Sequence, residues 1–127
     1  MKLLAIAGLG AVGSLLRYLL DGWVQRIVAS GFPWGTLSVN VLGSFLIALV
    51  MQVAGARGAL DSNARIALTA GLLGGFTTYS SFNQQTLELL RERDTLHAAL
   101  YVVGTVLLCL VAGLLGLGSG RLLTGGA

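Results

Sequence analysis

The side chains best suited to chemistry lie in residues 71–86, GLLGGFTTYSSFNQQT. Two adjacent glycines, Gly74 and Gly75, precede seven polar residues between Thr77 and Gln85, and aromatic rings stand at positions 76, 79 and 82. Glycine pairs weaken a helix, and hydroxyl side chains compete for its backbone hydrogen bonds. The stretch is therefore predicted to interrupt a helix and to leave backbone N–H and C=O groups without their helical partners.

The composition of the chain indicates that this interruption lies in a membrane protein. Of 127 residues 55% are apolar and only 10% charged, which is typical of a membrane protein rather than a soluble one. Within a bilayer, unpaired backbone groups are tolerated only where they are buried in protein or line a wet cavity. Residues 71–86 are therefore predicted to form the functional site.

The distribution of charge and of reactive side chains excludes several classes of function. A net charge of +3 is small and scattered, and does not indicate nucleic-acid binding. The single cysteine, Cys109, cannot form an internal disulfide, and the lone His97 has no partners for a metal site. The sequence holds no acid–base pair and no Ser/His/Asp or Cys/His set, so we predict that the protein is not an enzyme.

The apolar segments predict an all-α membrane protein with four transmembrane helices in a single membrane domain, residues 1–127. The predicted spans cover residues 3–20, 36–54, 65–90 and 96–123, and the third span is broken in mid-membrane by residues 71–86. The first span contains Gly8, Gly10 and Gly13 in a G-x-G-x-x-G spacing. Since no strand–turn–helix unit surrounds it, close helix packing is the better interpretation than nucleotide binding.

Polar residues on the other spans are candidates to face the break. Asn40 and Ser44 lie four residues apart on one face of the second span, where they indicate either interhelical hydrogen bonding or a ligand contact. Tyr101, Thr105 and Cys109 form a stripe along the fourth span. Gly116 and Gly120 follow in a G-x-x-x-G spacing for close packing.

Arg17, near the end of the first span, has two interpretations. Its side chain either reaches to the membrane interface alongside Asp21, or provides a fixed positive charge that attracts anions at a pore mouth.

The loops carry nearly equal numbers of cations on the two sides of the membrane. One side holds Lys2, Arg57, Arg65 and Arg121, and the other holds Arg26, Arg91 and Arg93. Because orientation follows the Lys/Arg asymmetry between loops, this balance predicts insertion in both orientations. Two copies in opposite orientation would bring their breaks together about a two-fold axis in the membrane plane.

Two motifs resemble the Fluc/CrcB family of bacterial fluoride channels: GTLSVN at Gly35–Asn40 and GGFTTYSSF at Gly74–Phe82. The resemblance covers the whole chain. It implies an antiparallel, dual-topology homodimer in the bacterial inner membrane, with two pores that export toxic cytoplasmic fluoride passively. It also implies a structural sodium ion (Na+) at the dimer interface.

The resemblance further assigns roles to individual residues. The fluoride pore would be lined by Asn40, Tyr79, Ser81, Phe82, Tyr101, Thr105 and Cys109, with Arg17 in the vestibule. The backbone carbonyls of Gly74 and Thr77 would hold sodium. Aromatic ring edges are electropositive, and several weak donors can replace a hydrated anion's water without trapping the anion. The chain departs from the family pattern at Tyr79, Gln85 and Cys109, where Phe, Glu and Ser are usual.

A small multidrug-resistance-type proton antiporter is the main alternative, since it also has four spans and dual topology. That mechanism requires a carboxylate deep in the membrane. The five acids of this chain lie at span ends or in loops: Asp21, Asp61, Glu88, Glu92 and Asp94. A third alternative is a non-transporting assembly subunit, in which these polar residues would serve packing alone.

Overall fold

The computed structural model describes residues 1–58 and 60–125, so positions 59, 126 and 127 of the predicted domain lie outside the described residues. The described residues form helices and connecting turns, without β-strands. The elements are α1 (Lys2–Val28), α2 (Trp34–Arg57), α3 (Ser62–Ile66), η1 (Ala67–Leu73), α4 (Gly74–Phe76), α5 (Tyr79–Arg91) and α6 (Thr95–Thr124).

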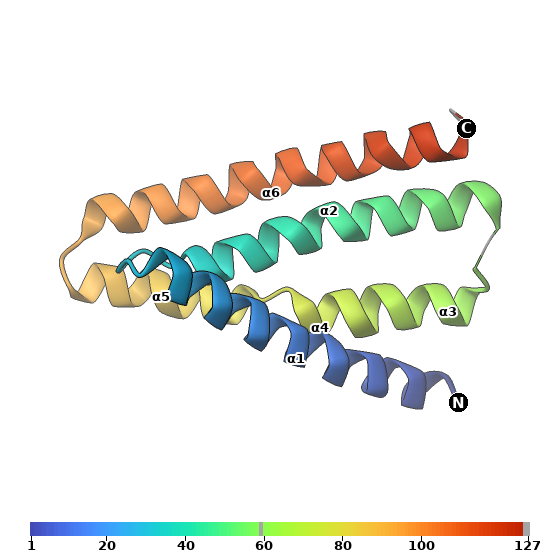
Figure 1. Ribbon diagram of the computed structural model, residues 1–127, viewed down its shortest axis with the longest axis horizontal. Coiled ribbons are helices and arrows are strands. Elements are labelled where there is room, and N and C mark those ends of the chain that lie inside the picture. The colour runs from blue at the N-terminus through green and yellow to red at the C-terminus, as the bar shows by residue number, and fades with distance from the viewer. Residues whose placement is uncertain (59, 126–127) are drawn as a thin grey trace.

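The helices run alternately in opposite directions along the molecule, so that the two termini lie at the same end (Figure 1). Helix α6 packs mainly against α2, whereas α1 packs mainly against η1 and, to an equal and lesser extent, against α2 and α4. Among the described residues α1, α2 and α6 are each long and apolar enough to cross a membrane. The protein is therefore an integral membrane protein.

The helices are longer than the predicted spans. Helix α1 continues to Val28 rather than ending near residue 20, so the connection to the second span begins only at Ala29. A single glycine in a long helix costs only about 1 kcal/mol, and the left-handed backbone of Ala29 (φ 45°) ends the helix instead. Helix α2 begins at Trp34, immediately after Pro33, a residue whose ring cannot continue a preceding helix.

The segment from Ser62 to Arg91 is built from short pieces. The Asp61 carboxylate caps α3 by accepting the Ala64 N–H at 2.6 Å, and η1 is a π-helix of seven residues. Helical geometry then lapses at Thr77 and Thr78, which both have extended backbone. Helix α5 restarts with the Thr78 hydroxyl accepting the Ser81 N–H at 3.2 Å. Thr78 is thus an N-cap of the usual type.

Glycines allow the close helix contacts that hold this segment in place. A Cβ atom on Gly13 of α1 would overlap the backbone carbonyl of Leu72, and one on Gly75 would overlap the carbonyl of Gly10. The interpretation of the G-x-G-x-x-G spacing as a packing motif is confirmed at Gly10 and Gly13, whereas Gly8 faces open space. On α6, a Cβ atom on Gly116 would likewise overlap the Phe45 carbonyl of α2, which agrees with the close packing that the G-x-x-x-G spacing predicts.

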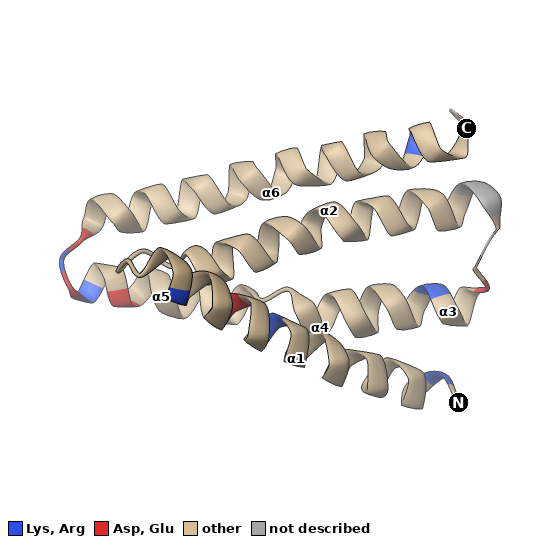
Figure 2. Cartoon of the chain, in the orientation of Figure 1, with Lys and Arg blue, Asp and Glu red and all other residues tan. Residues whose placement is uncertain are grey.

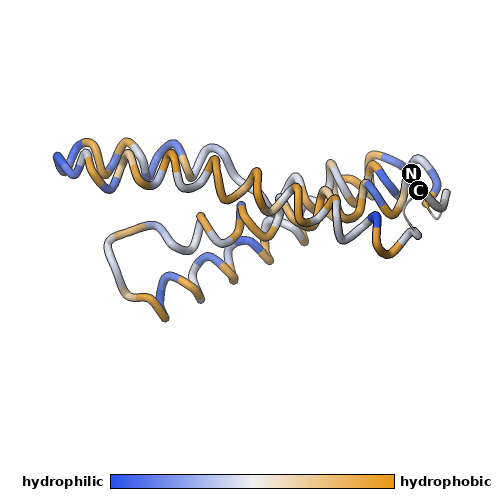
Figure 3. Tube along the Cα trace, turned by 90° about the horizontal axis from the view of Figure 1, so that it is seen from above, coloured by the Kyte–Doolittle hydropathy of each residue, from blue (hydrophilic) through white to orange (hydrophobic). Residues whose placement is uncertain are grey.

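Charged and hydrophilic residues gather toward the ends of the molecule (Figures 2 and 3). Arg17 and Asp21 are exceptions, because α1 runs on past them to Val28. The middle of the molecule is therefore apolar except along the segment that surrounds Thr77 and Thr78.

Candidate functional site

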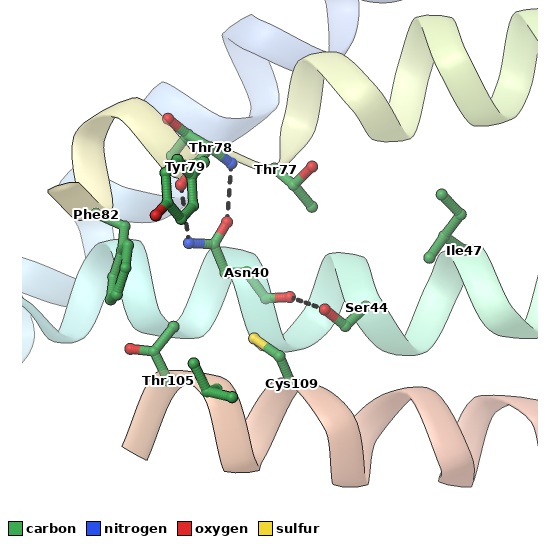
Figure 4. A pocket seen from close by; sticks show the side chains of 10 residues that line it. Asn40, Ser44, Ile47, Thr77, Thr78, Tyr79, Phe82, Thr105 and Cys109 are labelled. Carbon is green, nitrogen blue, oxygen red and sulfur yellow. Dashed lines mark hydrogen bonds between the residues drawn. The ribbon is translucent and has the colours of Figure 1, made fainter. Parts of the chain in front are cut away.

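The interruption between α4 and α5 is held by one side chain from α2. The Thr78 N–H donates to Asn40 Oδ1 at 2.8 Å, and Asn40 Nδ2 donates to the Thr78 carbonyl at 3.0 Å (Figure 4). Both residues are buried, with 9% of Asn40 and 6% of Thr78 exposed. The side-chain amide therefore pairs with both backbone groups of Thr78, which would be costly to bury without partners.

The same interruption takes the helical donors from backbone carbonyls, including those of Gly74 and Thr77. In a continuous helix the Gly74 carbonyl accepts the N–H four residues later, but that N–H, on Thr78, donates to Asn40 instead. The Thr77 carbonyl loses its helical donor in the same way, since the Ser81 N–H donates to the Thr78 hydroxyl. Gly74 and Thr77 are the two residues predicted to present carbonyls to a cation.

A cavity of about 340 Å³ lies beside the interruption, between α2, α5 and α6. The structure brings five of the predicted pore residues together in its wall: Asn40, Tyr79, Phe82, Thr105 and Cys109. Its remaining lining residues are Ser44, Ile47, Thr77, Thr78 and Val106. No lining residue carries a formal charge, so the cavity offers only neutral groups to an occupant.

Hydrogen-bond donors in this cavity remain available to an occupant. The Asn40 amide has two N–H hydrogens, and the bond to Thr78 uses one of them. The Thr105 hydroxyl is buried and has no partner within the described residues. The Ser44 hydroxyl, in contrast, donates to the Asn40 carbonyl at 2.7 Å, and the free thiol of Cys109 is a weaker donor. Asn40 and Thr105 thus line this cavity with donors that the described residues do not use.

The aromatic residues near the cavity differ in exposure. The Phe82 ring lies between Tyr79 and Tyr101, with ring centroids 5.6 and 5.1 Å away. Tyr79 is 79% exposed, whereas Tyr101 is fully buried and donates to Gln85 Oε1 at 2.8 Å. Tyr101 is not among the cavity-lining residues. Its ring instead supports Phe82 from behind.

Arg17 and Ser81 line a second cavity of about 600 Å³, on the α1 side of the interruption. Arg17 Nε is buried without a hydrogen-bond partner among the described residues. Among the described residues Arg17 forms no ion pair with Asp21, and the two interpretations of Arg17 stay predictions. The Asp21 carboxylate instead accepts the Thr36 hydroxyl at 2.7 Å.

Sequence reasoning missed the contact that joins the interruption to α2. Thr78 was part of the predicted break, but its backbone pairing with Asn40 was not foreseen. A Thr directly before an amphipathic polar helix is a capping signal, and an Asn in an apolar helix signals a polar partner. Neither signal says that the two residues meet, because they lie 38 positions apart in the chain. Ile47 and Val106 carry no signal, since apolar residues occur throughout both helices.

Comparisons with known proteins agree with this geometry. The family described as "CrcB-like protein, Camphor Resistance (CrcB)" matches residues 4–117. The chain belongs to the CrcB-like family.

Relatives of this CrcB-like chain match it over almost their whole length. A Geobacter metallireducens protein named fluoride-specific ion channel FluC is 46% identical over 121 residues, which cover 95% of this chain and 98% of the relative. Proteins of the same name from Thermus thermophilus and Sorangium cellulosum are 48% and 41% identical, with at least 92% of every chain covered. Both motifs at Gly35–Asn40 and Gly74–Phe82 lie inside the matched region.

Proposed function

We propose that this protein is a fluoride-selective ion channel that exports fluoride passively, and that the cavity beside Asn40 is part of its ion path. The relatives carry the name of this function. The observation on which the proposal rests is the composition of the cavity wall, which joins an amide, a hydroxyl, aromatic rings and a thiol without any charged group. Such a wall replaces the water of a small anion by several neutral donors.

The neutral wall also explains how an anion could leave as well as enter. A cation in the narrow part of a pore would bind fluoride tightly and slow its release, whereas permeation requires binding at several weak sites. Arg17 lies in the neighbouring larger cavity and not in this one. It would therefore attract anions at the entrance, while Asn40, Phe82 and Thr105 would pass them on. A proton antiporter would need a carboxylate in this cavity for proton exchange, and none lines it.

We further propose that the functional unit is an antiparallel homodimer with dual topology and two pores. The balance of loop cations supports insertion in both orientations. The exposure of Tyr79 on one chain (79%) supports a second chain that covers it. A single copy leaves this cavity partly open, and an inverted copy would close it within the bilayer. In this arrangement the interruption at Thr77 and Thr78 lies at mid-membrane.

Sodium is proposed as a structural ion at the dimer interface, held by the carbonyls of Gly74 and Thr77. Both carbonyls have lost their helical donors, and Gly74 is exposed on the single chain. Hard cations bind to oxygen ligands of this kind. Within the described residues no cluster of His, Cys, Asp or Glu offers a competing metal site. Two carbonyls from each copy would supply a symmetric set of ligands for the ion. We further propose that the protein lies in the inner membrane of a bacterium.

Fluoride efflux from liposomes that contain the purified protein tests the proposed function. We expect fluoride to leave down its gradient, with chloride retained and with no dependence on a proton gradient. Efflux that requires a counter-transported ion, or the absence of efflux, would remove the channel from consideration. Protein-free liposomes and liposomes with Asn40→Asp protein serve as controls, since a carboxylate at this position repels an anion.

The dimer is tested separately by topology. A reporter fused to the C-terminus should be detected on both sides of the membrane, in similar amounts. A single orientation would exclude the antiparallel homodimer without affecting the family assignment.

A further inference from the structure

The Asp21 carboxylate lies on the wall of the same cavity as Arg17, one helical turn away on α1. Residues four apart on a helix are neighbours and readily form ion pairs. An ion pair here would neutralise the guanidinium in the cavity where the proposed channel admits anions. The described part of the chain shows no such pair.

The first turn of α2 holds the carboxylate instead. The Thr36 hydroxyl donates to Asp21 Oδ2 at 2.7 Å, and Thr36 is fully buried. Gly35 provides the space, since a Cβ atom on it would overlap both Asp21 Oδ1 and the Asp21 carbonyl. The N-terminal end of a helix also stabilises a negative charge through the helix dipole. Three features of α2 thus draw the carboxylate toward that helix.

The consequence appears at Arg17. Its side chain lines the cavity, and its Nε is buried without a hydrogen-bond partner among the described residues. A buried guanidinium N–H without an acceptor is costly in the resting protein, so the arrangement favours an anion that enters from outside.

We infer that Thr36 and Gly35 are positioning residues: they hold the Asp21 carboxylate on α2 so that Arg17 remains free to attract permeant anions in the entrance cavity. This inference rests on the proposed channel function, because it assigns a role in anion entry. It assigns no contact between Asp21 and the ion. Thr36 and Gly35 act by keeping the Asp21 charge away from Arg17.

The test combines Thr36→Val, which removes the anchor, with Thr36→Ser as the matched control that keeps the hydroxyl. In Thr36→Val the released carboxylate should pair with Arg17 and lower fluoride efflux at low fluoride by about tenfold, since a cleft of one charge sign raises ion entry by at least that factor. Thr36→Ser should conduct as the wild type does. Adding Asp21→Asn to Thr36→Val should restore efflux, because no carboxylate is left to pair.

A purely structural role for the Thr36–Asp21 bond gives different results. It predicts that the double variant is as slow as Thr36→Val, and that Asp21→Asn alone also slows efflux. Either result would overturn the inference, as would wild-type efflux in Thr36→Val. The salt dependence adds a second criterion. Wild-type efflux should fall as inert salt rises, because salt screens the attraction to Arg17, and Thr36→Val should respond less.

A spectroscopic measurement separates this inference from the channel proposal. The ¹⁵Nε–H resonance of Arg17 should shift in Thr36→Val, as the ion pair forms, and return to its wild-type position in the double variant. An unchanged resonance in Thr36→Val overturns the inference. If wild-type liposomes show no fluoride efflux, the proposed function fails, and this resonance alone decides whether Thr36 keeps Asp21 away from Arg17.

Discussion

Replacing Asn40 by Leu removes the side chain that pairs with the interrupted backbone while keeping the side-chain volume similar. The replacement deletes both hydrogen bonds to Thr78, at 2.8 and 3.0 Å. The Thr78 N–H and C=O would then be buried without the amide that now pairs with them. No other side chain among the described residues forms a hydrogen bond with these two backbone groups, so local repair would require movement of α5.

The size of the effect follows from these two groups. An unsatisfied buried backbone group costs about 1–3 kcal/mol, so two groups cost about 2–6 kcal/mol. Water in the adjacent cavity can solvate one of them, and interhelical hydrogen bonds in membranes average only about 0.6 kcal/mol. We therefore expect Asn40→Leu to lower the free energy of unfolding by about 2–4 kcal/mol. Fluoride efflux should be lost as well, because the free amide hydrogen is removed with the anchor.

The assay is equilibrium unfolding in detergent micelles, with efflux measured on the same preparations. Ser44→Ala is the matched control, since Ser44 lines the same cavity but bonds only to the carbonyl of Asn40 in its own helix. It should cost less than about 1 kcal/mol. The prediction would be wrong if the free energy of unfolding of Asn40→Leu lay within about 0.5 kcal/mol of the wild type, because changes that small are typical of sites without such contacts.

Three further predictions concern other parts of the molecule. Phe82→Ile should lower fluoride efflux by about tenfold, since an aromatic edge contact is worth about 0.5–1.5 kcal/mol, and unchanged efflux would remove the ring from the ion path. Gly13→Val should destabilise the protein by about 3 kcal/mol by overpacking against a backbone carbonyl. Gly8→Ala, in open space within α1, should instead stabilise it by up to about 1 kcal/mol in the same unfolding assay. The hydrogen bonds from the His97 backbone N–H and side chain lower the pKa of Asp94 in the folded protein. The ionised Asp94 should therefore stabilise the fold above the pKa that Asp94 has in the unfolded chain, and this stabilisation should be lost as the pH falls through the lower pKa of the folded protein. Asp94→Asn should show no such loss in acid unfolding.

Much of the architecture could be predicted because hydrophobicity and small residues act locally. The long apolar runs indicated membrane helices, and the spacings at Gly10, Gly13 and Gly116 indicated close packing that the structure shows. Helix ends were less predictable. The end of α1 at Val28 depends on the left-handed backbone of Ala29. The hydropathy of residues 20–28 does not predict that conformation.

The chemical character of the protein could be predicted from its composition: a membrane chain without catalytic groups, with neutral donors and rings around one glycine-rich stretch. That is so because composition and local backbone preference do not depend on which helices become neighbours. The tertiary structure alone decided the pairings. It joined Asn40 to Thr78, placed Tyr101 behind Phe82, and drew Asp21 to Thr36 rather than to Arg17. Each pairing satisfies a buried polar group or ring through a residue distant in the chain, and only the packing of whole helices determines which partner comes within reach.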